Sequence, residues 1–303
     1  MKKDFLLLSD YSKEEILSLL ALALELKEKK KRGEPHRYLE GKRLGMIFEK
    51  SSTRTRVSFE VGMVDLGGYP LFLSGTDTQI GRGEPVEDTA RVFSRYLDGI
   101  MIRTFSQKTV DTLAKYATIP VVNGLTDFAH PCQVLADLLT IEEHKKMPFS
   151  ELTLCYIGDG NNVANSLIVG GIKVGMKVRT ACPAGYQPDT AIMAWAKANG
   201  DYLCTESVAE AATGADVLYT DVWASMGQES EAQARAKIFA GYQINGAVMQ
   251  AANNNAMVLH CLPAHRGEEI TADVLESHAN EIFDEAENRL HAQKAVLVHL
   301  MKN

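Results

Sequence analysis

Residues 44–66 read Leu-Gly-Met-Ile-Phe-Glu-Lys-Ser-Ser-Thr-Arg-Thr-Arg-Val-Ser-Phe-Glu-Val-Gly-Met-Val-Asp-Leu. The apolar run 44–48 predicts a buried strand, and from Val57 onward apolar side chains recur at helical spacing. Similar strand-like and helix-like runs alternate through most of the chain. This alternation is typical of α/β proteins with parallel sheets, so the sequence predicts that fold class.

Hydroxyls and arginines fill the turn where this strand becomes a helix. The free N–H groups of the first turn and the positive end of the helix dipole favour an anion there. Ser52, Thr53, Arg54 and Thr55 add hydroxyl and guanidinium donors that suit phosphate oxygens. Alternatively, Ser52 or Thr53 simply caps the helix and the arginines face solvent. Because two arginines alternate with threonines within one turn, a phosphate site is the favoured interpretation.

The composition is that of a soluble globular protein. Of the 303 residues, 46% are hydrophobic and 23% are charged, and the length suits two domains with separate cores. A formal charge of −7 argues against a nucleic-acid or anionic-membrane partner. Local arginines would therefore have to hold an anionic substrate.

The five cysteines are widely spaced and show no Cys-x-x-Cys or Cys/His ligand pattern. We therefore expect neither disulfides nor a bound metal, which suits a reducing cytosol. The apolar run at the N-terminus is too short for a signal peptide, and no stretch reaches transmembrane length. These features predict a cytoplasmic protein.

Two series of strands predict two doubly wound parallel-sheet domains with the active site in the crevice between them. We place one domain at 1–145, completed by the C-terminal helix segment 285–303, and the other at 146–284. The predicted strands are 44–48, 70–73, 99–103 and 120–123 in the first domain, and 152–157, 177–181, 202–204, 217–220 and 257–261 in the second.

Polar residues follow the strands of the first domain, at the edge where open α/β sheets bind ligands. Arg103 ends one strand, and His130-Pro-Cys-Gln133 follows the next and opens a helix with Pro131 at its first position. Taken singly, Arg103 could be a surface residue and His130 a structural hydrogen-bonding residue. Their shared placement after strands makes both of them candidate ligands.

In the second domain, Gly158-Asp-Gly-Asn-Asn162 is a partial dinucleotide fingerprint. Val163 stands where the third glycine would be, and the strand ending at Cys182 lacks the carboxylate that binds the adenosine ribose. We therefore interpret the asparagines as amide contacts to a polar ligand rather than as part of an NAD site. Asp221 and Cys261 end later strands, and Cys261 could equally be a small buried hydrophobic residue or a functional one.

Together these segments resemble the carbamoyltransferases, and specifically the ornithine carbamoyltransferases, over nearly the whole chain. The similarity rests on Ser52–Thr55, Arg103, His130–Gln133, Gly158–Asn162, Asp221 with Ser225-Met226-Gly227, His260–Pro263 and Glu285–Arg289. It implies that the first domain binds carbamoyl phosphate, that the second binds L-ornithine, and that L-citrulline and phosphate are the products. It also implies homotrimers, or multiples of trimers, with Gln79 in a loop lent to a neighbouring subunit.

The resemblance and the required chemistry together suggest roles. An amine must attack the carbonyl carbon through a tetrahedral oxyanion, and phosphate must leave. We expect four catalytic residues, two that donate to the carbonyl oxygen and two that position and deprotonate the amine: Arg103 and His130, and Asp221 and Cys261. The expected carbamoyl phosphate site comprises Ser52, Thr53, Arg54, Thr55, Gln79, Arg103, His130, Gln133, Cys261, Leu262 and Arg289, and the expected ornithine site Asn162, Asp221, Ser225 and Met226. No cofactor is needed, because orientation and electrostatics can supply most of the rate.

Alternative functions stay open at this point. The amine could be putrescine or an N-acyl-ornithine, although Asp221 and the Ser225-Met226-Gly227 motif argue against both. An inactive paralogue would not be expected to fill every site position, and an NAD-linked oxidoreductase would need the missing glycine. Cys261 as a covalent nucleophile is not required by the chemistry.

Overall fold

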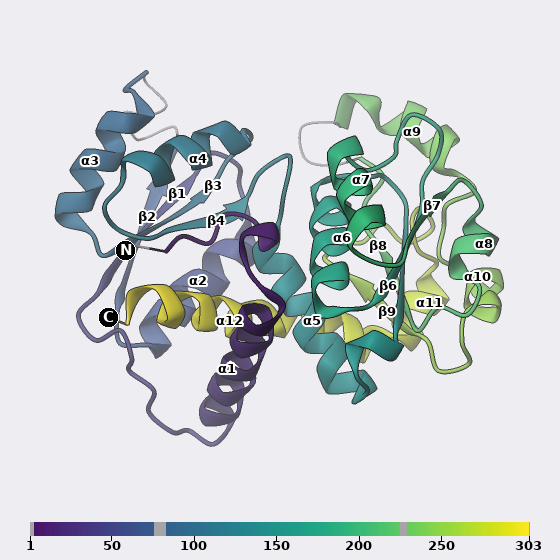
Figure 1. Cartoon of the computed structure of the whole chain (residues 1–303), viewed down its shortest axis with the longest axis horizontal. Coiled ribbons are helices and arrows are strands. Elements are labelled where there is room, and N and C mark those ends of the chain that lie inside the picture. Colours follow the sequence, from purple (N-terminus) through teal and green to yellow (C-terminus); the bar gives the residue numbers. More distant parts are fainter. Residues whose placement is uncertain (1–2, 76–82, 225–228, 303) are drawn as a thin grey trace. The chain divides into compact units, whose positions relative to one another are not determined.

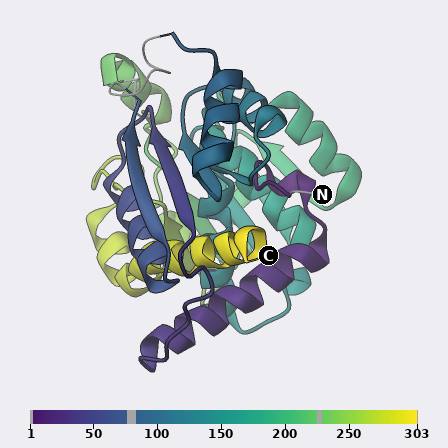
Figure 2. The same ribbon diagram turned by 90° about the vertical axis from the view of Figure 1, so that its left-hand side faces the viewer.

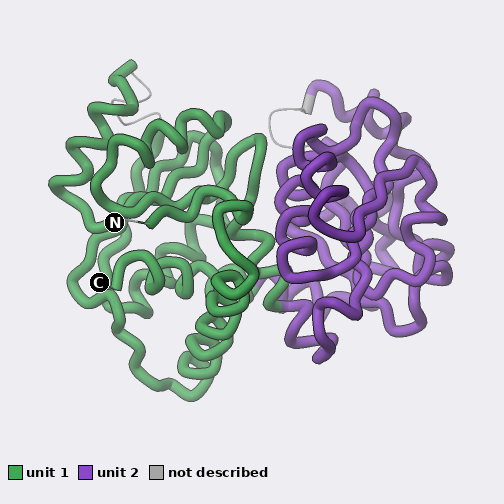
Figure 3. Tube along the Cα trace, viewed as in Figure 1, with its two compact units in different colours: residues 1–139, 287–303 green, residues 140–286 purple. Residues whose placement is uncertain are grey.

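The computed structural model describes residues 3–75, 83–224 and 229–302. The chain forms two compact units, which we call unit 1 (residues 1–139 and 287–303) and unit 2 (residues 140–286; Figure 3). The chain leaves unit 1 within helix α5 (Pro131–Lys145) and returns to it within α12 (Ala279–Met301). Among the described helices, none is long and apolar enough to cross a membrane.

Unit 1 is built on a four-stranded parallel sheet in the order β2-β1-β3-β4. The two central strands are buried along almost their whole length because their side chains are apolar on both faces. The edge strand β2 is half-buried or exposed throughout. The strands are β1 (Arg43–Phe48), β2 (Tyr69–Ser74), β3 (Gly99–Arg103) and β4 (Val121–Leu125).

Helices cover both faces of this sheet (Figures 1 and 2). On one face, α3 (Val86–Tyr96) and α4 (Gln107–Tyr116) bury Ala90 and Leu113 in a core with Ile102. On the other face lie α1 (Lys13–Lys31), α2 (Thr53–Asp65) and the part of α12 that belongs to unit 1. Asp65 on α2 pairs with Lys30 on α1 and Lys294 on α12, so one carboxylate joins three helices.

Unit 2 is built on a five-stranded parallel sheet in the order β7-β6-β5-β8-β9. The strands are β5 (Thr153–Ile157), β6 (Lys177–Ala181), β7 (Tyr202–Thr205), β8 (Val217–Thr220) and β9 (Met257–His260). Its helices are α6 (Asn162–Val174), α7 (Thr190–Asn199), α8 (Val208–Ala212), α9 (Ala232–Phe239), α10 (Gly246–Ala251) and α11 (Ala272–Ser277). Short 3₁₀ turns occur at Leu8–Asp10, Phe149–Glu151 and Glu229–Glu231.

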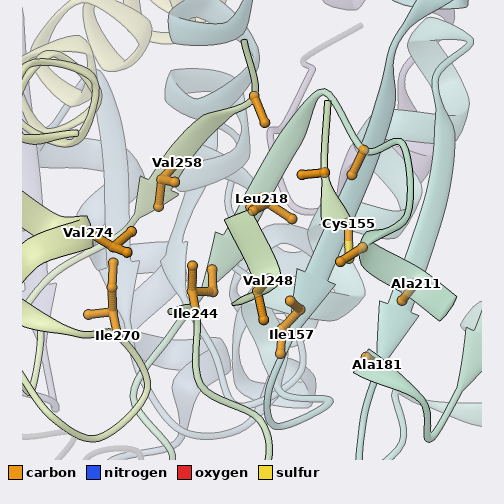
Figure 4. Packing of buried hydrophobic residues seen from close by; sticks show 14 of the residues in the cluster. Cys155, Ile157, Ala181, Ala211, Leu218, Ile244, Val248, Val258, Ile270 and Val274 are labelled. Carbon is orange, nitrogen blue, oxygen red and sulfur yellow. The ribbon is translucent and has the colours of Figure 1, made fainter. Parts of the chain in front are cut away.

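Small and β-branched side chains fill the core between this sheet and helices α8, α10 and α11 (Figure 4). Leu218 on β8 and Val258 on β9 pack with Val248 of α10 and Val274 of α11. Small residues such as Ala211 let α8 approach the sheet closely, while α6 and α7 pack together elsewhere in the unit. The core fixes the ends of β5, β8 and β9, which carry the candidate site of this unit.

The strand order of each sheet reverses at one point, where open α/β sheets form a crevice at their carboxyl ends. In unit 1 the order reverses between β1 and β3, and in unit 2 between β5 and β8. The polar motifs Ser51–Arg56 and Gly158–Asn162 follow β1 and β5, and Arg103 and Asp221 end or follow their partners β3 and β8. The topology thus places the predicted motifs at the ligand-binding edge of each sheet.

The predicted α/β class with two parallel sheets and all nine predicted strands are confirmed, and no strand boundary differs by more than two residues. The C-terminal helix is longer than predicted and begins at Ala279 rather than near Glu285. Its first turns remain with unit 2, because Ile282 is fully buried in that core and the Glu285 carboxylate accepts from Tyr219 and the His260 backbone. The predicted strand 257–261 ends at His260, so Cys261 lies just beyond it.

Candidate active site

In unit 1, the anion-binding candidate is the N-terminus of α2. Ser52 is the N-cap, and its Oγ accepts from the Thr55 backbone N–H at 3.2 Å. The capping interpretation of Ser52 is therefore correct, but the capping hydroxyl keeps its own hydrogen to donate to an anion. Thr53 and Arg54 are exposed beside the cap, whereas Thr55 is buried.

The second arginine of this motif is turned away from the cap. The Arg56 guanidinium lies 3.7 Å from the centre of the Phe72 ring and donates to Glu60 at 2.9 Å. These contacts place Arg56 on the outer face of α2, one helical turn before Glu60. Arg54 is thus the arginine of the pair that suits a ligand role.

Arg103 and His130 are buried near the carboxyl end of the unit 1 sheet. Arg103 is the last residue of β3, and His130 directly precedes α5. Burial, followed by the positive charges of Arg289, Arg103 and Arg54, holds the pKa of His130 well below its ordinary value of 6.5. His130 is therefore a neutral imidazole at pH 7, able to donate one hydrogen bond among three guanidinium groups.

Gln133, Arg289 and Thr55 form a hydrogen-bonded set in unit 1. Arg289 donates from Nη1 to Gln133 Oε1 at 2.6 Å and from Nη2 to Thr55 Oγ1 at 3.2 Å. All three side chains are buried, and they come from α5, α12 and α2. Arg289 therefore joins two other predicted residues of the carbamoyl phosphate site, one of them in the first turn of α2.

In unit 2, Asp221 is the centre of the candidate site. Its Oδ1 accepts from the Cys261 thiol at 3.0 Å and from the Val222 N–H at 2.8 Å, and its Oδ2 accepts from Asn161 Nδ2 at 2.8 Å. Asn161 also caps α6, with its Oδ1 accepting from Val163 and Ala164. The cap thus fixes the amide that orients the Asp221 carboxylate.

The half-buried Cys261 lies beside a buried histidine that organises the next turn. The His260 Nδ1 accepts from the Leu262 N–H at 2.9 Å, and its Nε2 lies 3.0 Å from Glu269 Oε1, both groups being fully buried. Leu262 has a φ of 56°, in the left-handed region that a side chain with a Cβ adopts rarely and mainly at functional sites. The buried His260–Glu269 pair thus holds the unusual backbone that presents Cys261.

Asp221, His260 and Cys261 place three potential metal ligands within 4.8 Å of one another. Both ring nitrogens of His260 already make protein hydrogen bonds, and the Cys261 thiol donates to Asp221. A second group, His265, Glu268 and Glu269, is largely exposed. The first donor set is therefore best described as a hydrogen-bonded network that orients Asp221 and Cys261.

The glycine-rich turn after β5 packs closely against another segment of the chain. The Gly160 N–H donates to the Tyr186 carbonyl at 2.8 Å, and a Cβ at Gly160 would lie 2.2 Å from the backbone at Gln187 and Pro188. Gly160 is therefore required for the close packing of residues 186–188 against this turn. The glycine thus has a packing role within the protein.

A buried ion pair braces the same turn. Arg235 on α9 donates from Nη1 to Asp159 Oδ2 and to the Trp223 carbonyl, both at 2.9 Å, and from Nε to Glu231 at 3.1 Å. Its guanidinium thereby joins the segments that carry Asn161 and Asp221. Sequence patterns assigned no role to Arg235, Asp159, Asp137 or Glu269, and of these Asp137 alone had a readable signal, since it lies four residues after Gln133 on one helix. Asn161 was expected to contact a ligand, whereas in the structure it caps α6 and orients Asp221.

The structure gathers the predicted residues as two sets, one in each unit. Ser52, Thr53, Arg54, Thr55, Arg103, His130, Gln133 and Arg289 belong to unit 1, and Asn162, Asp221, Cys261 and Leu262 to unit 2. Asn162 is the first residue of α6, next to the capping Asn161. Gln79, Ser225 and Met226 lie outside the described residues.

Comparisons with known proteins cover the full chain. Models of the aspartate/ornithine carbamoyltransferase family match residues 3–143 (carbamoyl-P binding domain) and 150–300 (Asp/Orn binding domain). An ornithine carbamoyltransferase of Syntrophotalea carbinolica is 59% identical over 304 residues, which cover 99% of this chain and 100% of the relative.

Two solved structures are also similar. An ornithine carbamoyltransferase from Pyrococcus furiosus is 52% identical with a TM-score of 0.94, covering 99% of this chain and 97% of that chain. An anabolic ornithine carbamoyltransferase from Campylobacter jejuni is 43% identical with a TM-score of 0.92, covering 98% of each chain. The chain therefore belongs to the aspartate/ornithine carbamoyltransferase family.

Proposed function

We propose that this protein transfers the carbamoyl group of carbamoyl phosphate to the side-chain amine of L-ornithine. The amine nitrogen forms a bond to the carbamoyl carbon, and the bond from that carbon to the phosphate oxygen breaks. With carbamoyl phosphate as a dianion and the amine protonated at the start, the products are L-citrulline, monohydrogen phosphate and one proton. The family relationship supports this activity.

We propose that unit 1 binds carbamoyl phosphate. The first turn of α2, with Ser52, Thr53 and Arg54, is suited to the phosphate group and to the charge that grows on it as it leaves. Arg103, His130 and Thr55 are suited to donate hydrogen bonds to the carbonyl oxygen, where charge develops in the tetrahedral intermediate. The observation that carries this assignment is the hydrogen-bonded set that Arg289 forms with Gln133 and Thr55 at the first turn of α2. His130 directly precedes the helix of Gln133, and in its neutral form it keeps one ring N–H that can donate.

We propose that unit 2 binds the amino acid and prepares its amine. Protonated ornithine cannot attack, so a carboxylate and a thiol in contact are suited to hold the ammonium group and to help it lose a proton. Asp221 and Cys261 are the pair that we assign to this step, with Asn162, Ser225 and Met226 proposed as contacts to the α-amino and α-carboxylate groups. Leu262 and Cys261 are also proposed contacts to carbamoyl phosphate.

A steady-state assay of phosphate release with a panel of amines tests this proposal. L-Ornithine should give the highest kcat/KM, and mass spectrometry should identify citrulline as the product. A higher kcat/KM with putrescine or N-acetylornithine would show that this amine, and not ornithine, is the substrate. Absence of phosphate release with every amine would refute carbamoyl transfer.

We propose that the protein assembles as a homotrimer or a multiple of trimers. Supporting this, α2 and the neighbouring strand β2 expose five apolar side chains: Val57, Val61 and Val64 on α2, and Leu71 and Phe72 on β2. The three valines follow helical spacing on one face, and an exposed apolar edge strand is suited to a second copy of the chain.

Light scattering should give a particle of three times the 33.3 kDa chain, or a multiple of it. Val61→Glu combined with Phe72→Glu should shift the mass toward the monomer, whereas Val92→Glu on α3 should not, although Val92 is similarly exposed. A monomeric wild type, or a trimer untouched by the double substitution, would refute this interface.

We further propose that Gln79 completes the site of a neighbouring subunit. Proteins altered at Arg54 and at Gln79 would be mixed, unfolded and reassembled. In a cyclic trimer each site would contain residues of two chains, so about one quarter of sites should combine an unaltered Arg54 with an unaltered Gln79. Mixed trimers as inactive as both parents would rule out sharing.

We also propose a cytoplasmic location. The five cysteines all lie in the described part of the chain and form no disulfide there, and three of them are buried, as expected in a reducing compartment. Fractionation of the source cells with an antibody against the protein would test this location.

A further inference from the structure

Asp137 is a buried carboxylate in unit 1 to which neither the sequence patterns nor the proposed mechanism assigns a role. It lies on α5, four residues after Gln133, so the two side chains share one face of the helix. Its exposed fraction is 0%. A carboxylate is costly to bury and is retained where its hydrogen bonds matter.

Asp137 fixes which way round the Gln133 amide lies. Gln133 Nε2 donates to Asp137 Oδ1 at 2.8 Å, and Gln133 Oε1 accepts from Arg289 at 2.6 Å. A carboxylate can only accept and a guanidinium can only donate. Both partners therefore require the same orientation of an amide group that would otherwise be able to rotate by half a turn.

This orientation has a consequence for the ligand. An amide oxygen has two lone pairs and can accept from a second donor besides Arg289. In this orientation the amide can therefore accept from an N–H group of a ligand, whereas a reversed amide would present hydrogens instead. The carbamoyl NH2 group is a donor whose nitrogen lone pair is delocalised, so it needs an acceptor of this kind.

We propose that Asp137 is a positioning residue that makes the site selective for carbamoyl over acyl phosphates. It does so by holding Gln133 Oε1 available to the carbamoyl NH2 group. Acetyl phosphate has the same phosphate and carbonyl groups but carries a methyl group in place of the NH2 group, and so gains nothing from that oxygen. The inference rests on the proposed binding of carbamoyl phosphate in unit 1.

The test compares three ligands on the assembled enzyme: carbamoyl phosphate, acetyl phosphate and inorganic phosphate. Affinities are measured from KM and from competitive inhibition. Asp137→Leu, which is similar in size but has no acceptor for Gln133 Nε2, should weaken carbamoyl phosphate binding about tenfold, the change expected when one buried hydrogen bond to the ligand is lost. The affinities for acetyl phosphate and inorganic phosphate should stay within twofold of their wild-type values. The ratio of carbamoyl phosphate affinity to acetyl phosphate affinity should therefore fall about tenfold.

A double-mutant cycle separates positioning from a general effect of charge or packing. In a Gln133→Met background no amide remains to be oriented, so Asp137→Leu should then change carbamoyl phosphate affinity by less than twofold. Glu142→Leu, the same kind of change on the exposed side of the same helix, should leave all three affinities unchanged. If Asp137→Leu does not fold, Asp137→Ala serves in the same cycle.

Three results would overturn the inference. One is an equal change in affinity for all three ligands, which would indicate a general effect of the lost negative charge. Another is an effect that persists in the Gln133→Met background, which would indicate packing, and the third is an unchanged preference for the carbamoyl group. Failure of the proposed function is distinguishable, because the wild type itself would then neither bind carbamoyl phosphate nor transfer its carbamoyl group.

Discussion

Replacing Arg235 with methionine should lower the free energy of unfolding, because it leaves a buried carboxylate in unit 2 without its ion-pair partner. Methionine keeps most of the apolar stem of arginine but removes the hydrogen bonds to Asp159, Glu231 and the Trp223 carbonyl. The side chains of Arg235 and Asp159 are 8% and 12% exposed, so water can replace the guanidinium only in part. The change thus leaves Asp159 charged and almost buried.

The expected loss at pH 7 is about 3–5 kcal/mol of the free energy of unfolding, the usual cost of breaking a buried ion pair on one side. The loss should depend on pH in a definite direction. Burial already raises the pKa of Asp159, and the charge of Arg235 opposes that rise. Without Arg235 the pKa should rise further above its unfolded value, so the folded variant takes up a proton that the unfolded chain does not.

Where the folded state binds more protons than the unfolded state, stability falls as pH rises. Relative to wild type, the variant should therefore recover stability as pH falls from 7 toward the unfolded pKa of about 4, by up to ~1.4 kcal/mol per pH unit. Adding Asp159→Asn to the variant removes the charge permanently and should restore much of the loss at pH 7.

Urea unfolding followed by circular dichroism at pH 5, 6 and 7 would measure these free energies for wild type, both single variants and the double variant. Glu231→Gln is the matched control, since it removes a partner of Arg235 that is 59% exposed and should cost less than ~1 kcal/mol. The reasoning would be refuted if the loss in Arg235→Met were the same at all three pH values. A double variant no more stable than Arg235→Met would refute it equally.

Three further predictions concern the site and its surroundings. Arg54→Ala should weaken carbamoyl phosphate binding by 10-fold or more, because a charge-assisted hydrogen bond contributes about 1.5–3 kcal/mol. Its Tm should not fall, because Arg54 is exposed, and Arg56→Gln should leave the affinity nearly unchanged. Calorimetry that finds the same affinity in both variants would contradict this assignment. Cys261→Ala should raise KM for ornithine more than KM for carbamoyl phosphate, and a carbamoyl mass on Cys261 in enzyme quenched with carbamoyl phosphate alone would disprove direct transfer. Burial lowers the pKa of His291 from 6.5 to about 3, so the folded state binds fewer protons than the unfolded chain between these values and stability should fall below pH 6.5, by about 2 kcal/mol between pH 7 and pH 5. His291→Gln should reduce that fall, and urea titrations that show the same pH dependence in both proteins would exclude His291 as a source.

Much of the fold was predictable because its signals are local. Strands such as β3 are short runs of apolar residues bounded by polar ones, and they are buried on both faces as such runs predict. Pro131 begins α5 as expected for a first helical position, and Ser52 caps α2. Capping and periodicity act over one or two turns, so they can be read directly from the order of residues.

Some local signals were still read incompletely. The two asparagines after Gly160 were both candidate ligand contacts, but Asn161 is the α6 cap and holds Asp221. The C-terminal helix begins six residues before the predicted start, because Ile282 is buried in the core of unit 2. In both cases the local sequence was compatible with more than one outcome, and a contact with a distant segment decided which one formed.

The order of residues alone was enough to predict the α/β class, the strand series, the polar turn at the start of α2 and the candidate site residues. The tertiary structure decided which of them meet. Arg289 reaches Thr55 and Gln133 across 234 and 156 residues, and Cys261 reaches Asp221 across 40. The structure also decided that Arg56 turns outward, that Asp137 orients Gln133 and that Gly160 serves the packing of residues 186–188. The physical reason is range: hydrogen-bond caps and hydrophobic periodicity are fixed by neighbours in the chain, whereas burial, pKa and side-chain partners depend on segments that only the packed sheets bring together.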